Sequence, residues 1–138
     1  MIIDESTDSG ARAAERLRDE IVIWLTTISP KSGPLPMPVW FLWDRADRVL
    51  MFSQDGARVR NLQAEPRVSL NFDGDGRGGN IVVLSGVANV DPQAGPADRI
   101  DAYLEKYAGH IKRIGLTPEQ FGAKYSNPIR IELTKLRR

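Results

Sequence analysis

Six short segments with the composition of β-strands follow one another along the chain, and several are separated by only a few residues. Two of them, "MPVWFLW" (37–43) and "RVLMFS" (48–53), flank the polar turn "DRAD", which is typical of a β-hairpin. Strands joined by short connections pair antiparallel, because a parallel pair needs a long crossover. The sequence therefore predicts a mainly β protein built on an antiparallel sheet. The six expected strands are residues 24–29, 37–43, 48–53, 67–73, 80–90 and 128–134.

Turn and loop residues separate these strands. "PKSGPLP" (30–36) is dense in Pro and Gly and is interpreted as a turn, and "GDGRGG" (74–79) as a hairpin loop. The loop lacks the pattern of a phosphate-binding loop, and it joins two strands instead of opening a helix. Within the run 80–90, Gly86 indicates a bulge or a close approach of two backbones.

Helical patterns flank the strands without alternating with them. Apolar residues recur at helical spacing in 11–25, with Ser9 as a candidate cap, and again from Ile100 to Tyr107. A shorter helix is expected at 57–64. The sequence "TPEQ" (117–120) has the composition of a capping box. Because strands dominate, a doubly wound α/β layout is disfavoured, and a small closed or nearly closed barrel with helices packed outside fits best.

Composition limits what such a barrel can do. The 138 residues are sufficient for one domain, 1–138, and the sequence leaves open whether residues 1–10 form an ordered segment or a disordered tail. The net charge of +1 carries no nucleic-acid or membrane signature.

With no cysteine, thiol catalysis and disulfides are excluded. A single histidine, His110, excludes a multi-histidine metal site and is interpreted as a packing or surface residue. No secretory leader or membrane-spanning segment is evident, so a cytoplasmic protein is expected.

The stretch "FSQDGARVRNLQAEPRVSL" (52–70) is the candidate functional site. It places a strand end directly before a helix start, where free N–H groups and the helix dipole attract anions. Arg58 and Asn61 are three residues apart and share one helix face, and Ser53 and Gln54 just precede the helix. A guanidinium can hold a phosphate through two parallel hydrogen bonds. These four residues therefore have the composition of a phosphate clamp.

A purely structural interpretation of the same stretch stays open. Asp55 could cap the helix, and the arginines could lie on a solvated face and pair with Glu65.

Trp40 and Trp43 could stack on a ligand or belong to the core. If their strand alternates regularly, they face opposite sides and cannot line the same pocket. No pair of acids, metal set or nucleophile–base pair stands out, so catalysis would require a cofactor.

The residues from Pro38 to Phe72 resemble the split β-barrel proteins related to pyridoxamine 5'-phosphate oxidase. The shared pattern is strand, turn, strand, then Ser-x-x-x-x-(Lys or Arg)-x-x-Asn-Leu, then Pro-Arg-Val, with Arg58 at the basic position. "GNIVVLSGVANV" and "YSNPIRIELTKLR" resemble the later strands of the family, so the similarity covers about residues 12–137. Within the family, the chain is most similar to the short actinobacterial reductases that use the deazaflavin coenzyme F420.

The resemblance implies a six-stranded antiparallel split β-barrel, of the FMN-binding type, with flanking helices. It also implies a homodimer whose two cofactor sites lie at the subunit interface. Gly74–Asn80 and Arg130 are weaker candidates for contacts to the ring or tail of the cofactor. The residues expected to bind cofactor are Val39, Trp40 and Phe41 near the ring and Ser53, Gln54, Arg58 and Asn61 at the phosphate.

The activity implied is hydride transfer from reduced F420 to an enone, a quinone or a similar unsaturated small molecule, with no metal. The catalytic residues are not defined by the sequence, although Tyr125 and Ser126 are candidate proton donors. Three alternatives stay open: an FMN-dependent oxidoreductase, a cofactor-binding or storage protein without turnover, and a dimeric interaction module. FMN is the alternative cofactor because the same scaffold holds it in pyridoxamine phosphate oxidases.

Overall fold

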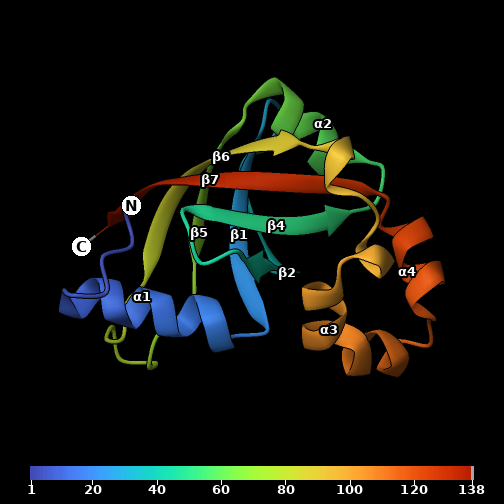
Figure 1. Ribbon diagram of the computed structural model, residues 1–138. Helices are drawn as coiled ribbons and strands as arrows, with labels where there is room; N and C mark the ends of the chain where they lie inside the picture. The colour runs from blue at the N-terminus through green and yellow to red at the C-terminus, as the bar shows by residue number, and fades with distance from the viewer. Residues whose placement is uncertain (138) are drawn as a thin grey trace.

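The computed structural model describes residues 1–137, in which a strongly curled antiparallel sheet is flanked by helices (Figure 1). All neighbouring strands pair antiparallel in the order β2-β1-β5-β6-β7-β4-β3. The strands are β1 (Val22–Ser29), β2 (Gly33–Trp40), β3 (Leu42–Trp43), β4 (Arg48–Ser53), β5 (Arg67–Asn71), β6 (Val83–Val90) and β7 (Asn127–Arg137). The helices are α1 (Asp8–Asp19), α2 (Ala57–Ala64), α3 (Asp101–Arg113) and α4 (Pro118–Lys124), with short 3-10 turns η1 (Pro92–Ala94) and η2 (Ala97–Arg99).

The two edge strands of the sheet, β2 and β3, are consecutive in the chain and meet at Phe41. The sheet therefore curls until its edges approach one another, which gives the half-barrel form of a split barrel. One strand was expected at 37–43, but the structure divides that run into the end of β2 and the short β3. Within residues 1–137 the sheet consequently has seven strands instead of the six expected.

The expected turn at 30–36 was too long, because β2 already begins at Gly33. Pro34, Pro36 and Pro38 lie inside this strand, opposite Ile28, Thr26 and Trp24 of β1. Proline lacks the N–H that a strand ladder uses, but it is tolerated where that N–H would not face the neighbouring strand. Because the prolines occupy every second position, the N–H groups of the residues between them remain available to bond to β1.

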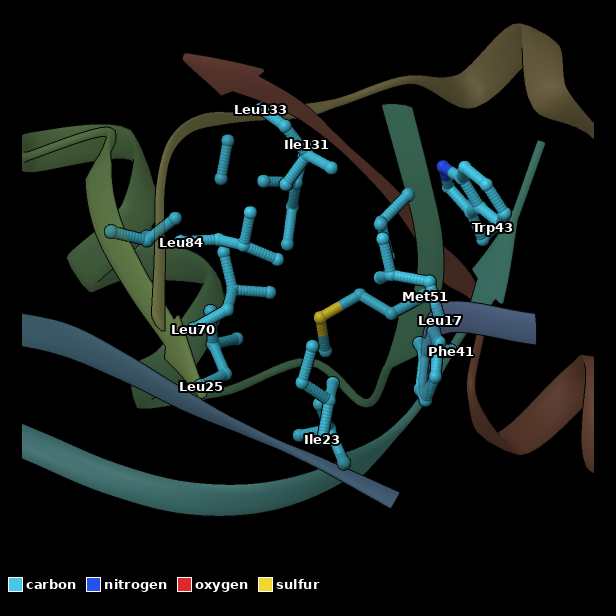
Figure 2. Packing of buried hydrophobic residues seen from close by; sticks show 14 of the residues in the cluster. Leu17, Ile23, Leu25, Phe41, Trp43, Met51, Leu70, Leu84, Ile131 and Leu133 are labelled. Atoms are coloured by element: carbon cyan, nitrogen blue, oxygen red, sulfur yellow. The ribbon is translucent and has the colours of Figure 1, made fainter. Parts of the chain in front are cut away.

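The barrel interior is filled by the inward-facing residues of every strand. Figure 2 shows Leu25, Leu70 and Leu84 packing toward Met51 and Ile131 across the barrel. In β5, Val68 and Leu70 are buried, as is Phe72 directly after the strand, while the residues between them are more exposed, as the alternation predicted. Burial of each such side chain contributes about 1.5–3 kcal/mol, so this interior is the main source of stability.

Gly86 marks a bulge in β6, as its position in the sequence indicated. The register with β7 shifts between Ser85 and Gly86. A Cβ at Gly86 would lie 2.8 Å from the backbone oxygen of Glu132 and 2.8 Å from a methyl carbon of Ile131. The residue is therefore glycine because the neighbouring strand comes too close for any side chain.

The helix α1 runs along one end of the barrel (Figure 1). It begins at Asp8 and is capped by Thr7, whose hydroxyl accepts a hydrogen bond from the N–H of Gly10 at 3.0 Å. The expected cap, Ser9, is wrong, because it lies inside the first turn. The residues before α1 also pack onto the barrel, with Ile3 buried and the N–H of Ile2 donating to the carboxylate of Asp47.

The helices α3 and α4 form a second layer on the other side of the molecule (Figure 1). Their apolar faces, with Tyr103, Tyr107 and Phe121, build a separate hydrophobic cluster on Leu50 and Phe52 of β4. The predicted capping box of α4 is confirmed: Thr117 and Gln120 exchange two hydrogen bonds. Among residues 1–137, no helix is long and apolar enough to cross a membrane.

Candidate functional site

A cleft of about 440 Å³ lies between the barrel and the α3–α4 layer. One side is formed by the β1–β2 hairpin, another by the corner where β4 passes into α2, and a third by the two helices. Its lining is mainly apolar and aromatic, and polar groups enter from the β4–α2 corner. The residues that line it include Trp40, Gln54, Arg58, Phe121 and Tyr125, with the more exposed Val22 and Ile114 at its margin.

Arg58 is the principal charged group in this cleft. Its side chain is half-buried, and burial lowers the pKa of its guanidinium, an effect that the nearby Tyr125 partly opposes. Arginine still stays protonated at neutral pH. Within residues 1–137, Arg58 makes no ion pair and no side-chain hydrogen bond. A half-buried cation without a counter-charge is costly, so the cleft is suited to an anion.

The start of α2 adds backbone donors to the same corner. Gly56 occupies the N-cap position with a φ of +149°, a conformation that favours glycine, and no side chain caps the helix. The first N–H groups of a helix have no partner within the helix and attract negative charge. Asp55, which could have capped them, instead accepts a 2.6 Å hydrogen bond from the amide of Asn127. The corner is therefore left open to an external acceptor.

Stacked aromatic rings line the cleft. Trp40 lies between Tyr107 and Phe121, with ring centroids 4.8 and 5.5 Å away and planes within 16° of parallel. Phe121 stacks in turn on Tyr125 at 4.5 Å. Aromatic faces of this kind suit the flat body of a conjugated ligand. The edge of His110 contacts Trp40, which confirms the packing interpretation of this histidine.

Tyr107 fixes the position of Trp40 relative to the barrel. Its hydroxyl accepts a 2.8 Å hydrogen bond from the N–H of Phe41 and lies 2.7 Å from the carbonyl oxygen of Ile21. Because Phe41 directly follows Trp40, these contacts tie α3 to the strand end that carries the indole. Burial raises the pKa of the Tyr107 phenol well above its usual value, so this hydroxyl remains a neutral bridge.

The structure brings together some of the residues expected to bind cofactor and separates others. Val39, Trp40, Gln54 and Arg58 line the cleft. Phe41 is fully buried in the barrel core against Phe72. Ser53 is buried, and its hydroxyl donates to the carbonyl of Gln54 at 3.1 Å. Asn61 lies one turn beyond Arg58 on α2 and is not part of the cleft wall.

The other basic candidates lie in different surroundings. Arg67 pairs with Glu65, as the structural interpretation proposed, and Arg60 is exposed. Arg130 forms an ion pair with Asp91 at 3.1 Å. The 74–79 loop lies beside α1, where Arg16 donates to the carbonyl of Asp73 at 2.7 Å. Of the three arginines at the corner, only Arg58 enters the cleft.

Trp40 and Trp43 occupy different environments, as regular alternation predicted. Trp40 lines the cleft, whereas Trp43 is buried in the core and donates its indole N–H to the carbonyl of Ala46 at 2.6 Å. Tyr103 and Phe121 also line the cleft, although neither was predicted as a site residue. The helical spacing of 103 and 107 and the capping box before 121 were visible, but they do not reveal which surface these apolar faces cover.

The family model for pyridoxamine 5'-phosphate oxidase matches residues 10–137. No curated protein sequence matches the chain significantly. Similar solved structures include a FAD-binding protein from Mesorhizobium loti (TM-score 0.67, 20% identity, 91% of this chain and 88% of the other). A conserved hypothetical protein from Mycobacterium tuberculosis has a TM-score of 0.62 with 24% identity, over 93% and 80% of the two chains.

A third solved structure, described as an F420 reductase, has a TM-score of 0.59 with 16% identity and covers 90% of this chain and 92% of its own. Identities this low establish a common fold. The family model, in contrast, spans nearly the whole chain, from α1 to the end of β7. This protein therefore belongs to the pyridoxamine 5'-phosphate oxidase family of split β-barrel proteins.

Proposed function

We propose that the protein is an F420-dependent reductase that transfers a hydride from reduced deazaflavin to an unsaturated small molecule such as an enone or a quinone. The observation that carries the proposal is Arg58: a half-buried guanidinium without a partner among residues 1–137, beside an uncapped helix start and an aromatic cleft. An anionic, flat cofactor fits this combination of groups. The similarity of residues 38–72 to the short deazaflavin reductases favours F420 over FMN.

The residues present fit such a cofactor in two ways. Arg58 and the first N–H groups of α2 would hold its phosphate, with Gln54 offering a further donor. Trp40, Phe121 and Tyr125 supply an apolar wall for the conjugated ring. When bound, reduced F420 supplies a hydride from C5 of its ring. The apolar wall would position the substrate and exclude water from the reacting atoms.

Of the two candidate proton donors, only Tyr125 lines the cleft, where it lies near Arg58. Ser126 is exposed and not part of the cleft wall. A phenol beside a guanidinium can donate a proton to a substrate oxygen on which negative charge develops. We therefore assign the role of proton donor to Tyr125 within the proposal.

We also propose that the protein acts as a homodimer whose partner subunit completes the cleft. The β1–β2 hairpin exposes Ile28, Leu35 and Met37, with exposed fractions of 37%, 37% and 50%. Ile28 shares the outer face of the hairpin with Val22, whereas Leu35 and Met37 lie on the other face. Val22 and Ile114, which line the cleft, are 38% and 50% exposed. Exposed apolar side chains on a hairpin that also lines a ligand cleft are what a partner subunit would cover.

The proposal is tested by titrating the purified protein with F420 and, separately, with FMN, using ligand fluorescence. Arg58→Ala should weaken F420 binding about 10- to 100-fold, because charge-assisted hydrogen bonds contribute about 1.5–3 kcal/mol each. Arg60→Ala, an exposed arginine on the same helix, is the matched control and should leave binding unchanged.

The outcomes separate the alternatives. Preference for FMN would assign the protein to the flavin-dependent oxidoreductases on the same fold. Tight F420 binding with no oxidation of the reduced cofactor across a broad panel of enones and quinones would indicate a binding or storage protein. If neither cofactor binds at saturating concentration, the β4–α2 corner is structural and the proposal fails.

A further inference from the structure

A second cavity, of about 400 Å³, lies on the opposite side of α3 from the cofactor cleft. Its walls come from α1, from β3 with the turn that follows it, and from α3. We refer to it as the α1–α3 cavity. Leu17, Leu42 and Trp43 form its apolar base, and Arg18, Arg45 and Lys106 contribute three cationic side chains.

Lys106 is an unusual lysine within this cavity. Its ammonium nitrogen lies 3.7 Å from the centre of the Phe41 ring and donates to the carbonyl oxygen of Phe41 at 3.0 Å. Within residues 1–137 it has no carboxylate partner at ion-pair distance. The other four lysines of the chain, Lys31, Lys112, Lys124 and Lys135, are all exposed.

Partial burial favours the neutral form of the Lys106 amine. Desolvation lowers its pKa to about 8, while the carboxylates of Asp19 and Glu20 oppose that shift. Roughly a tenth of the amine is then neutral at pH 7, against less than a thousandth for an ordinary lysine. A neutral lysine amine is the nucleophilic form, so Lys106 combines reactivity with a cavity that can hold a reagent.

The two arginines determine which reagents the cavity favours. Arg45 makes no ion pair among residues 1–137, and Arg18 reaches only Glu5, at 3.6 Å on the exposed side. Guanidinium groups bind phosphate through paired hydrogen bonds. Glu105 is the acidic residue among the cavity-lining side chains, so the cationic groups outnumber it by three to one.

We propose that Lys106 is a modification site, acylated by small acyl phosphates that the α1–α3 cavity binds through Arg18 and Arg45. The neutral amine attacks the carbonyl carbon of the acyl phosphate. The new N–C bond forms as the C–O bond to phosphate breaks, inorganic phosphate leaves with the electron pair, and the amine proton passes to solvent. No oxidation or reduction occurs, and the acyl donor is the only co-reactant.

Acylation would change the contact between Lys106 and the barrel. The amide product is uncharged, so the cation–π contact with Phe41 is lost, although an amide N–H can still donate to the Phe41 carbonyl. Because Phe41 follows Trp40 in the chain, the modification acts one residue away from the indole that lines the cofactor cleft. Acylation of Lys106 does not depend on which cofactor the cleft binds.

The test incubates the full chain with acetyl phosphate at pH 7.5 and follows acetylation of each lysine by peptide mass spectrometry. Lys106 should react at least about five times faster than any of the four exposed lysines, although simple accessibility predicts the reverse order. Its rate should level off near pH 8, while the exposed lysines accelerate toward pH 10. A Lys106 rate equal to or below that of the exposed lysines overturns the proposal.

Two variants test the guanidinium groups, with thermal unfolding as the check that each remains folded. Arg18→Gln removes one cation, and Arg45→Asn removes the other with a residue that tolerates the φ of +67° at this position. Each should slow acetylation of Lys106 by acetyl phosphate several-fold and leave its reaction with the uncharged reagent N-acetoxysuccinimide unchanged. If the acetylation rate falls equally with both reagents, or does not fall with acetyl phosphate, the proposed binding of phosphate by Arg18 and Arg45 is overturned.

Discussion

Arg58 and Lys106 are two cations that the fold draws partly out of water, and each faces a different cavity. Neither has a carboxylate partner at ion-pair distance among residues 1–137. Partial desolvation lowers the pKa of both groups, yet the consequences differ. The guanidinium stays charged and attracts anions, whereas the amine becomes neutral more readily and can react as a nucleophile.

The depressed pKa of Lys106 predicts a specific dependence of stability on pH. Between about pH 8, where the folded amine loses its proton, and about pH 10.5, where the unfolded amine does, the unfolded state binds more protons. The contribution of Lys106 to the free energy of unfolding therefore rises with pH over this window, by an amount on the order of 1 kcal/mol for a half-solvated group.

Lys106→Met keeps most of the packing volume but has no titratable group, so it should lack this rise. The measurement is urea unfolding of both proteins at pH 7.5 and pH 9.5. Because the buried tyrosines are the same in both proteins, their titration cancels in the comparison. Parallel changes of the two free energies with pH would contradict the assignment.

Tyr125 carries the second prediction at this scale. Tyr125→Phe retains the ring that stacks on Phe121 and removes only the hydroxyl. If Tyr125 donates the proton, kcat of the proposed reductase should fall by roughly 10²-fold while cofactor binding stays within about twofold. Equal kcat values for the two proteins would show that the proton comes from elsewhere.

Single residues also show how far the sequence could define the site. The position of Arg58 at the β4–α2 corner could be predicted because it depends on local signals. A strand end, a glycine turn and a helix start lie within six residues. Phe121 was not assigned to the site, and Tyr125 was named only as a candidate proton donor implied by the resemblance, because both lie more than sixty residues further along the chain. Their place in the cleft depends on tertiary packing of α4 against α3 and Trp40, which no local pattern encodes.

Among the elements, β6 and β7 come so close at Gly86 that no side chain fits between their backbones. Gly86→Ala places a methyl group 2.8 Å from the Glu132 carbonyl oxygen, so the strands must separate or the bulge must shift. We expect a loss of about 1–3 kcal/mol in the free energy of unfolding. Denaturant unfolding of the wild-type protein and the variant measures this difference in free energy.

Gly109→Ala provides the matched control. Gly109 lies inside α3, and a Cβ added there meets nothing within 4 Å. Alanine is about 0.5–1 kcal/mol more favourable than glycine in a helix interior. This variant should therefore be stabilised, and opposite signs for the two substitutions would distinguish local crowding from a general effect of replacing glycine.

Helix α2 and strand β2 show where element prediction succeeded and where it failed. The bounds of α2 were predicted as observed, at 57–64, because a turn signal and a proline enclose a short segment with helical spacing. The first half of β2 was assigned to a turn because its prolines disfavour strand structure locally. Pairing with β1 along eight residues outweighs that preference, and such pairing is a property of the folded chain.

For the whole molecule, the proposed dimer can be tested by mass in solution. The chain has a mass of 15.4 kDa, and a dimer should have twice that value by light scattering. Met37→Glu should reduce it to the monomer mass, because a carboxylate at the centre of the hairpin cannot be buried without a partner. Ile81→Glu, equally exposed at 51% but near the 74–79 loop, is the control and should remain dimeric.

The prolines of β2 have a further consequence for how molecules of this protein meet. Because Pro34, Pro36 and Pro38 cannot donate to β1, the alternate residues must do so, and the three proline nitrogens therefore face the outer edge of the sheet. That edge offers carbonyl oxygens but few N–H groups, so it is a poor template for an added strand. A second molecule can cover the hairpin face to face but is disfavoured from prolonging the sheet, which protects this edge of the barrel against amyloid-like stacking at high concentration.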